Sequence, residues 1–235
     1  MTKLVRTAAL FSTLTAAILC VFAGSAAARN LPDGFTVVPA SISPDGKLGV
    51  IAPDLDHAKE HEHQNKLVEI ATSKVLAVID ADTSFEHQNH TTLLPRWSKD
   101  GSLLVWYVDG KWGSYTLVLV RLEHGAVTSQ INARELAVAE ALRAAKQANP
   151  MAYAAAKQEG KDDGSWFRDG FAIEVRPEDP ETTKPALPMK LVIEMTSNPK
   201  EMDSYPKAAR FSGKLTGVVG ADGKITFSKL AVTTK

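Results

Sequence analysis

The sequence predicts a mainly β protein of antiparallel sheets, with one α-helical insertion at about residues 133–157. Three observations predict this fold class. Asp-Gly pairs, which suit tight hairpin turns, occur seven times along the chain. The segments between them are rich in β-branched and aromatic residues and have the length of strands. One stretch rich in Ala, Glu, Leu, Lys and Arg interrupts this pattern, and its composition favours a helix.

The N-terminal residues 1–28 have the pattern of a secretory signal peptide. Lys3 and Arg6 provide the positive start, an uncharged apolar stretch follows, and residues 26–28 are three alanines that fit a cleavage site. The alternative is a retained membrane anchor, although the apolar run is short for a span. Cleavage would remove Cys20, the only cysteine, which would exclude disulfides and thiolate chemistry from the mature chain. We therefore expect export, to a periplasm or outside the cell.

The charge balance excludes some kinds of partner. Removing Lys3 and Arg6 from 27 basic residues leaves 25 against 27 acidic residues, a net charge near −2. Nucleic-acid binding needs a basic excess, so no nucleic-acid partner is expected. No later segment approaches the ~20 apolar residues of a transmembrane helix, so we expect no stable membrane span in the mature chain. Another envelope or extracellular protein is the partner that we expect.

Two strands are expected around the sequence DGKWGS at 109–114. Residues 103–108 and 115–121 are β-branched and aromatic, and they flank this turn. Trp106 and Tyr107 alternate to opposite faces of the first strand. We therefore expect only one of these two aromatic rings to be buried.

The helical stretch at 133–157 begins after Asn132, a suitable N-cap residue. Pro150 should end or kink the helix because proline lacks the N–H that the helix needs. Residues 151–157 then form a second short helix, and 160–164 are a linker.

Further strands follow the linker. Residues 171–175 and 190–195 have strand composition, and residues 211–219 and 224–232 flank the turn GADG as a hairpin. The related segment GVVGADGK resembles a phosphate loop, but its spacing is wrong and a strand follows it, so we interpret it as a turn.

An internal repeat relates two of the Asp-Gly turns. SPDGKLGVIAPD at 43–54 aligns with SKDGSLLVWYVD at 98–109. WSKDG at 97–101 and ISPDG at 42–46 resemble the Trp-Ser-Pro-Asp-Gly turn of TolB-like and WD40-like β-propellers. In that family the turn joins the first two strands of a four-stranded blade. The resemblance covers about residues 35–131 and implies two blades.

A closed propeller needs at least four blades, so a β-sandwich or meander whose hairpins share turn chemistry remains the alternative. The predicted organisation has four parts. They are a signal peptide at 1–28, two blade-like β repeats at 29–131, a helical segment with linker at 132–164, and an antiparallel β region at 165–235.

Five of the six histidines lie between residues 57 and 90, where the letters Glu-His-Gln-Asn occur twice. The blade register ends strand two near Pro53 and begins strands three and four near Lys66 and Lys74. The loops that would follow strands two and four leave the same end of an antiparallel sheet, whereas His124 falls at the opposite end. These loops contain His57, His61, His63, His87 and His90.

The five clustered histidines are the candidate metal ligands. Neutral imidazole binds zinc, copper and nickel well, and Glu60, Glu62 and Glu86 could add oxygen ligands. Two other interpretations stay open, namely solvated polar loops and a contact that responds to pH.

Three functions follow from these observations. The first is an exported, non-enzymatic interaction or accessory protein, because loops at a sheet edge carry recognition. The second is an envelope metal-binding protein that uses the His-rich loop pair. The third is a hydrolase whose site the sequence does not reveal. No Gly-x-Ser-x-Gly elbow is present, and we predict neither catalytic residues nor an organic cofactor.

Overall fold

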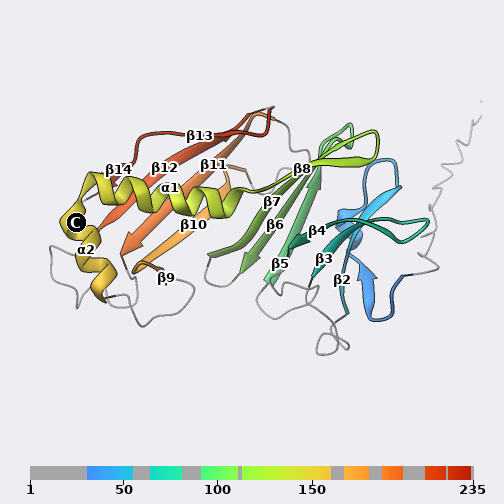
Figure 1. The fold of residues 1–235 in the computed structure, drawn as a ribbon, viewed down its shortest axis with the longest axis horizontal. Coiled ribbons are helices and arrows are strands. Elements are labelled where there is room, and N and C mark those ends of the chain that lie inside the picture. The colour runs from blue at the N-terminus through green and yellow to red at the C-terminus, as the bar shows by residue number, and fades with distance from the viewer. Residues whose placement is uncertain are drawn as a thin grey trace, which may run out of the picture.

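A computed structural model describes residues 31–54, 64–80, 91–110, 113–159, 167–179, 187–197, 210–220 and 222–233. Within these residues the chain forms three antiparallel sheets and two helices (Figure 1). The predicted mainly β fold with a helical insertion is therefore confirmed. The predicted signal peptide lies outside the described residues. Neither described helix combines the length and the apolar character needed to cross a membrane.

The first sheet follows the predicted strand bounds closely. Its strands, hydrogen-bonded in chain order, are β1 (Phe35–Val37), β2 (Leu48–Pro53), β3 (Asn65–Glu69) and β4 (Lys74–Asp80). A short 3-10 turn, η1 (Pro39–Ser41), lies between β1 and β2. Proline at the start of η1 fits its fixed φ angle.

The second sheet has the same simple order and longer strands. They are β5 (Thr91–Trp97), β6 (Leu103–Gly110), β7 (Gly113–Glu123) and β8 (Ala126–Asn132). The predicted hairpin around 109–114 is present, with Leu104 opposite Val120 in its register.

The second sheet is buried on both faces. Leu104, Trp106 and Val108 pack against the first sheet, whereas Val105 and Tyr107 pack toward the helices and the third sheet. The expectation that only one of Trp106 and Tyr107 is buried is therefore wrong, because their exposed fractions are 0% and 4%. A strand covered on both faces has no solvent side for either residue.

The helical insertion forms two helices, α1 (Ala133–Ala148) and α2 (Pro150–Glu159). Asn132 caps α1 as predicted, since its Oδ1 accepts a hydrogen bond of 3.0 Å from the Glu135 N–H. Pro150 begins α2, where its missing N–H costs least. The buried side of α1 is lined with small side chains one turn apart, namely Ala133, Ala137, Ala141 and Ala145.

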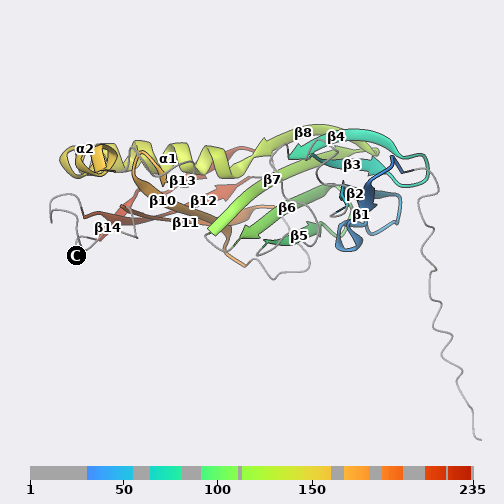
Figure 2. The same ribbon diagram turned by 90° about the horizontal axis from the view of Figure 1, so that it is seen from below.

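The third sheet lies under the helices and completes an elongated molecule (Figure 2). Its strands are β9 (Phe167–Arg168), β10 (Phe171–Pro177), β11 (Met189–Ser197), β12 (Ser212–Val219), β13 (Ile225–Phe227) and β14 (Ala231–Thr233). Phe171 stacks on Tyr153 of α2, with ring centroids 5.6 Å apart. Because β10 also contacts β7, one core joins this sheet to the second.

The final predicted strand, 224–232, is divided into β13 and β14. Gly217 pairs with Phe227 and Lys214 pairs with Ala231, so the β13–β14 segment carries one extra residue relative to β12. Such an extra residue is a bulge, and it redirects a side chain. Here Leu230 turns into the core over Gly213, where an added Cβ would lie 2.9 Å from the Leu230 Cδ1.

Candidate binding cleft

The turn between β5 and β6 is held by hydrogen bonds that Ser98 and Ser102 donate to Asp100. The Ser98 hydroxyl donates to Asp100 Oδ1 at 2.6 Å, and the Leu103 N–H donates to Ser98 Oγ at 2.9 Å. Gly101 adopts φ of +72°, which favours glycine. Hydrogen bonds from the Ser98 hydroxyl, and then from Ser102, lower the pKa of Asp100 to about 2. Asp100 therefore stays ionised at neutral pH.

The turn before β2 is built in the same way. The Ser43 hydroxyl donates to Asp45 Oδ1 at 2.7 Å, and the Leu48 N–H donates to Ser43 Oγ at 2.9 Å. Gly46 has φ of +73°. The Ser43 hydrogen bond, and then that of the Lys47 N–H, hold the pKa of Asp45 below its usual value. Each carboxylate is thus occupied mainly in closing its own turn.

A buried hydrogen bond fixes the two sheets to each other beside these turns. Trp97 is 6% exposed, and its Nε1–H donates to the Ser41 carbonyl at 2.7 Å. The Ser41 hydroxyl donates to the Val38 carbonyl at 2.6 Å and accepts from the Val50 N–H at 2.7 Å. The position of the Trp97 indole is therefore set by both sheets.

Two adjoining hollows open between the sheets at this end. The first, of about 480 Å³, is lined by Ala40, Ile42, Pro44, Pro95, Arg96, Trp97 and Lys99. The second, of about 430 Å³, is lined by Ser43, Pro44, Asp45, Leu48, Lys99, Asp100, Gly101, Ser102, Leu122, His124 and Gly125. Pro44 and Lys99 line both hollows, so they form one surface, which we call the turn cleft.

The turn cleft combines apolar surface with cationic side chains. Ile42 is 43% exposed although it is a large apolar residue. Lys99 is exposed and makes no ion pair with a carboxylate of the described residues. The Arg96 Nη1 donates to the Pro95 carbonyl at 2.8 Å, while its buried Nε has no hydrogen-bond partner in the described part of the chain. The turn cleft therefore offers both apolar contact and cationic side chains to a ligand.

The predicted metal ligands His57, His61, His63, His87 and His90 lie outside the described residues. The strand ends next to them are described: β2 ends at Pro53, β3 begins at Asn65 and β4 ends at Asp80. Asn65 pairs with Asp80, so these ends lie at one end of the sheet. Within the described ranges, no group of three or more His, Cys, Asp or Glu side chains could hold a metal ion.

His124 lies at the opposite end, as predicted. It has φ of +51° in the turn between β7 and β8, and it lines the turn cleft together with Asp45. This turn cleft was not predicted from the sequence as a site. The only sequence signal for it was the pair of related turns, which form part of its two walls.

Two polar groups that sequence reasoning missed lie near the junction with the third sheet and at α2. The Tyr107 hydroxyl donates to Asp109 at 3.3 Å, and burial, followed by the charge of Asp109, raises the pKa of Tyr107. Asp169 accepts a hydrogen bond from Tyr153 and pairs with Lys157 at 2.7 Å. Burial, followed by the Asp169 hydrogen bond, raises the pKa of Tyr153 to about 12. Tyr107 and Tyr153 therefore keep their hydroxyl protons at neutral pH, and the Tyr153–Asp169 bond joins α2 to the turn between β9 and β10.

Comparison with models of known protein families gives no match, and comparison with curated proteins gives none either. The geometry and charge of the described residues are therefore the basis for any functional assignment.

Proposed function

We propose that this chain is an exported, non-enzymatic interaction protein whose turn cleft receives another envelope or extracellular protein. The observation that carries the proposal is the turn cleft itself, which places exposed Ile42 beside Lys99, whose ammonium makes no ion pair among the described residues. Exposed apolar surface with a charged margin is typical of recognition surfaces.

The TolB-like and WD40-like resemblance is part of this proposal, with each of the first two sheets as one blade. It is supported by the chain order of the strands in both sheets and by the matching hydrogen bonds of the Ser43–Asp45 and Ser98–Asp100 turns. The packing of the two sheets around Trp106 also supports it, because blades stack face to face around a propeller axis.

Export is proposed from the leader at residues 1–28. Mass spectrometry of the chain recovered from a secreting host should give a mature N-terminus at Arg29. Recovery of the full-length chain in the membrane fraction would instead support the retained anchor.

Selection from an unbiased peptide display library tests the interaction role. Peptides selected on the mature chain should lose at least about tenfold in affinity with Ile42→Asp, because a buried unpaired carboxylate opposes apolar contact. The matched control is Leu136→Asp on α1, since Leu136 is 50% exposed and lies outside the turn cleft. Failure to select binders, or equal losses with both variants, would contradict the proposal.

A second candidate is metal binding by the two His-rich segments. It is favoured by the described strand ends at Pro53, Asn65 and Asp80, which lie at one end of the first sheet. Zinc, copper or nickel would be the metal, because imidazole suits all three.

Metal titration of the mature chain, purified without a His tag, tests this candidate. Stoichiometric binding that is abolished by His61→Ala with His87→Ala, and kept in the control His124→Ala, is expected. Weak binding that does not saturate would refute it.

A further inference from the structure

The two hollows of the turn cleft differ in charge. The first contains the cations Arg96 and Lys99 among its lining residues and has no carboxylate. The second contains Asp45 and Asp100, which accept hydrogen bonds within their own turns. An anionic group entering the turn cleft therefore meets attraction in the first hollow and repulsion in the second.

The Arg96 guanidinium is incompletely satisfied. One N–H donates to the Pro95 carbonyl, but the buried Nε has no partner among the described residues. A buried donor without a partner carries a desolvation cost. Carboxylates are the side-chain acceptors that match a guanidinium best.

The walls of the first hollow are apolar beside these cations. Ile42 and Pro44 come from the segment before β2, while Pro95 and Trp97 come from β5. Pro95 offers no N–H for strand pairing, and its carbonyl already accepts a hydrogen bond from Arg96 Nη1. Side-chain contacts, and not addition of a strand to β5, would therefore hold an occupant.

We infer that the first hollow binds an extended acidic peptide segment of the partner, with a carboxylate between Arg96 and Lys99 and an apolar side chain against Ile42. The inference rests on the proposed function and names the chemistry of the partner. Charge complementarity supports it, because this hollow presents two cations and no acid.

Three tetrapeptides with blocked ends provide the probes: Val-Glu-Val-Glu, Val-Gln-Val-Gln and Val-Lys-Val-Lys. Each is titrated into the isotope-labelled mature chain, and amide shifts are followed by NMR. The acidic peptide should shift the resonances of residues 40–44 and 96–99 and bind at least about fivefold more tightly than the other two.

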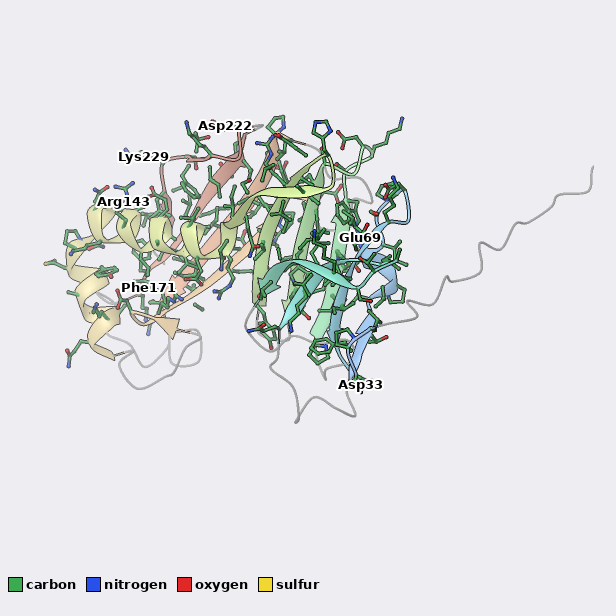
Figure 3. All side chains as sticks on the ribbon, turned by 45° about the vertical axis from the view of Figure 1, so that its right-hand side comes forward. Asp33, Glu69, Arg143, Phe171, Asp222 and Lys229 are labelled. Atoms are coloured by element: carbon green, nitrogen blue, oxygen red, sulfur yellow. The ribbon has the colours of Figure 1, made fainter. Side chains whose placement is uncertain are left out.

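Charge reversal in the protein provides a second test of the same inference. Lys99→Glu should weaken binding of the acidic peptide at least about fivefold, whereas Lys229→Glu should leave its affinity unchanged. Lys229 is an exposed lysine between β13 and β14 of the third sheet, whereas Glu69 is on the first sheet (Figure 3), and Lys229 lines neither hollow of the turn cleft. The comparison of Glu with Gln peptides needs no protein variant, so a folding defect cannot imitate the result.

Several outcomes would overturn the inference. They are equal binding of the Glu and Gln peptides, shifts confined to other regions, or no shifts at all. If display selection still yields neutral binders that are sensitive to Ile42→Asp, the proposed function stands and only the acidic preference fails. If selection also yields no such binders, both fail.

Discussion

Replacing Asp100 with asparagine should destabilise the protein at neutral pH and have little effect in acid. In the folded chain the carboxylate accepts hydrogen bonds from the Ser98 hydroxyl and from the N–H and hydroxyl of Ser102. Asparagine keeps an acceptor oxygen but loses the charge, and bonds to a neutral acceptor are about half as strong.

The magnitude follows from the pKa of Asp100, which falls from 3.8 to about 2. At ~1.36 kcal/mol per unit, this shift corresponds to about 2.5 kcal/mol before any correction. Asp100 is exposed to solvent, which screens such interactions, so the expected contribution is about 1 kcal/mol.

The direction of the pH dependence follows from the lowered pKa. The folded state binds the Asp100 proton less tightly than the unfolded state does. The stabilisation from the ionised carboxylate is therefore present above pH 3.8 and is lost as the pH falls toward about 2. The free energy of unfolding should therefore differ between the original protein and Asp100→Asn by about 1 kcal/mol at neutral pH. The difference should shrink steadily across that acid range.

Urea denaturation measures this difference, because urea adds no ionic strength. The control is Asp33→Asn, an exposed carboxylate of another Asp-Gly turn, expected to change stability by less than about 0.5 kcal/mol. An Asp100→Asn defect that stays constant down to acid pH would refute the reasoning, since its cause would then be turn geometry and not charge.

Three further substitutions probe the packing of the sheets and helices. Trp97→Phe should cost about 1–3 kcal/mol in urea denaturation, because the Ser41 carbonyl loses its buried donor. Gly170→Ala should cost more than about 1 kcal/mol and raise hydrogen exchange in α2, since φ is +81° and the new Cβ would lie 2.0 Å from a backbone oxygen of α2. Ala141→Leu should lower the thermal midpoint and cost about 1–3 kcal/mol by overpacking, whereas Ala139→Leu, on the exposed side of α1, should be nearly neutral.

The hairpins and the helix start were predictable because their causes are local. Asp100 and Gly101 form their turn by bonds within five residues, and Asn132 caps α1 three residues away. The starts of β3 and β4, expected near Lys66 and Lys74, lie at Asn65 and Lys74. The residues that stabilise such elements lie within a few positions of one another, so a single sequence is enough to predict them.

The burial of Tyr107 was not predictable by the same reasoning. Alternation along β6 separates Tyr107 from Trp106, but a partner sheet must decide whether each face is covered. The cover over Tyr107 includes residues such as Ile173 and Val175, which lie far along the chain. The signal that was available is the unbroken apolar run 103–108, which is typical of a strand covered on both sides.

The turn cleft depends on the same long-range packing. Ile42 and Lys99 are distant in the chain and line one hollow because the first two sheets pack against each other, with Trp97 bonded to the Ser41 carbonyl beside them. The two related turns indicated that the segments are alike, but they did not indicate that they are neighbours. The five clustered histidines gave the stronger sequence signal, and they fall outside the described residues.

The outer face of the first sheet also carries a buried apolar side chain. Val50 faces the second sheet, so Ile51, the next residue of β2, points to the opposite, outer face. Ile51 is nevertheless fully buried. Val37 is the register partner of Ile51 and therefore lies on the same face. Val37 and Ile70 also approach Gly49, where an added Cβ would lie 3.4 Å and 3.2 Å from their side chains. Glycine at position 49 therefore leaves room for these two side chains on the outer face of the sheet.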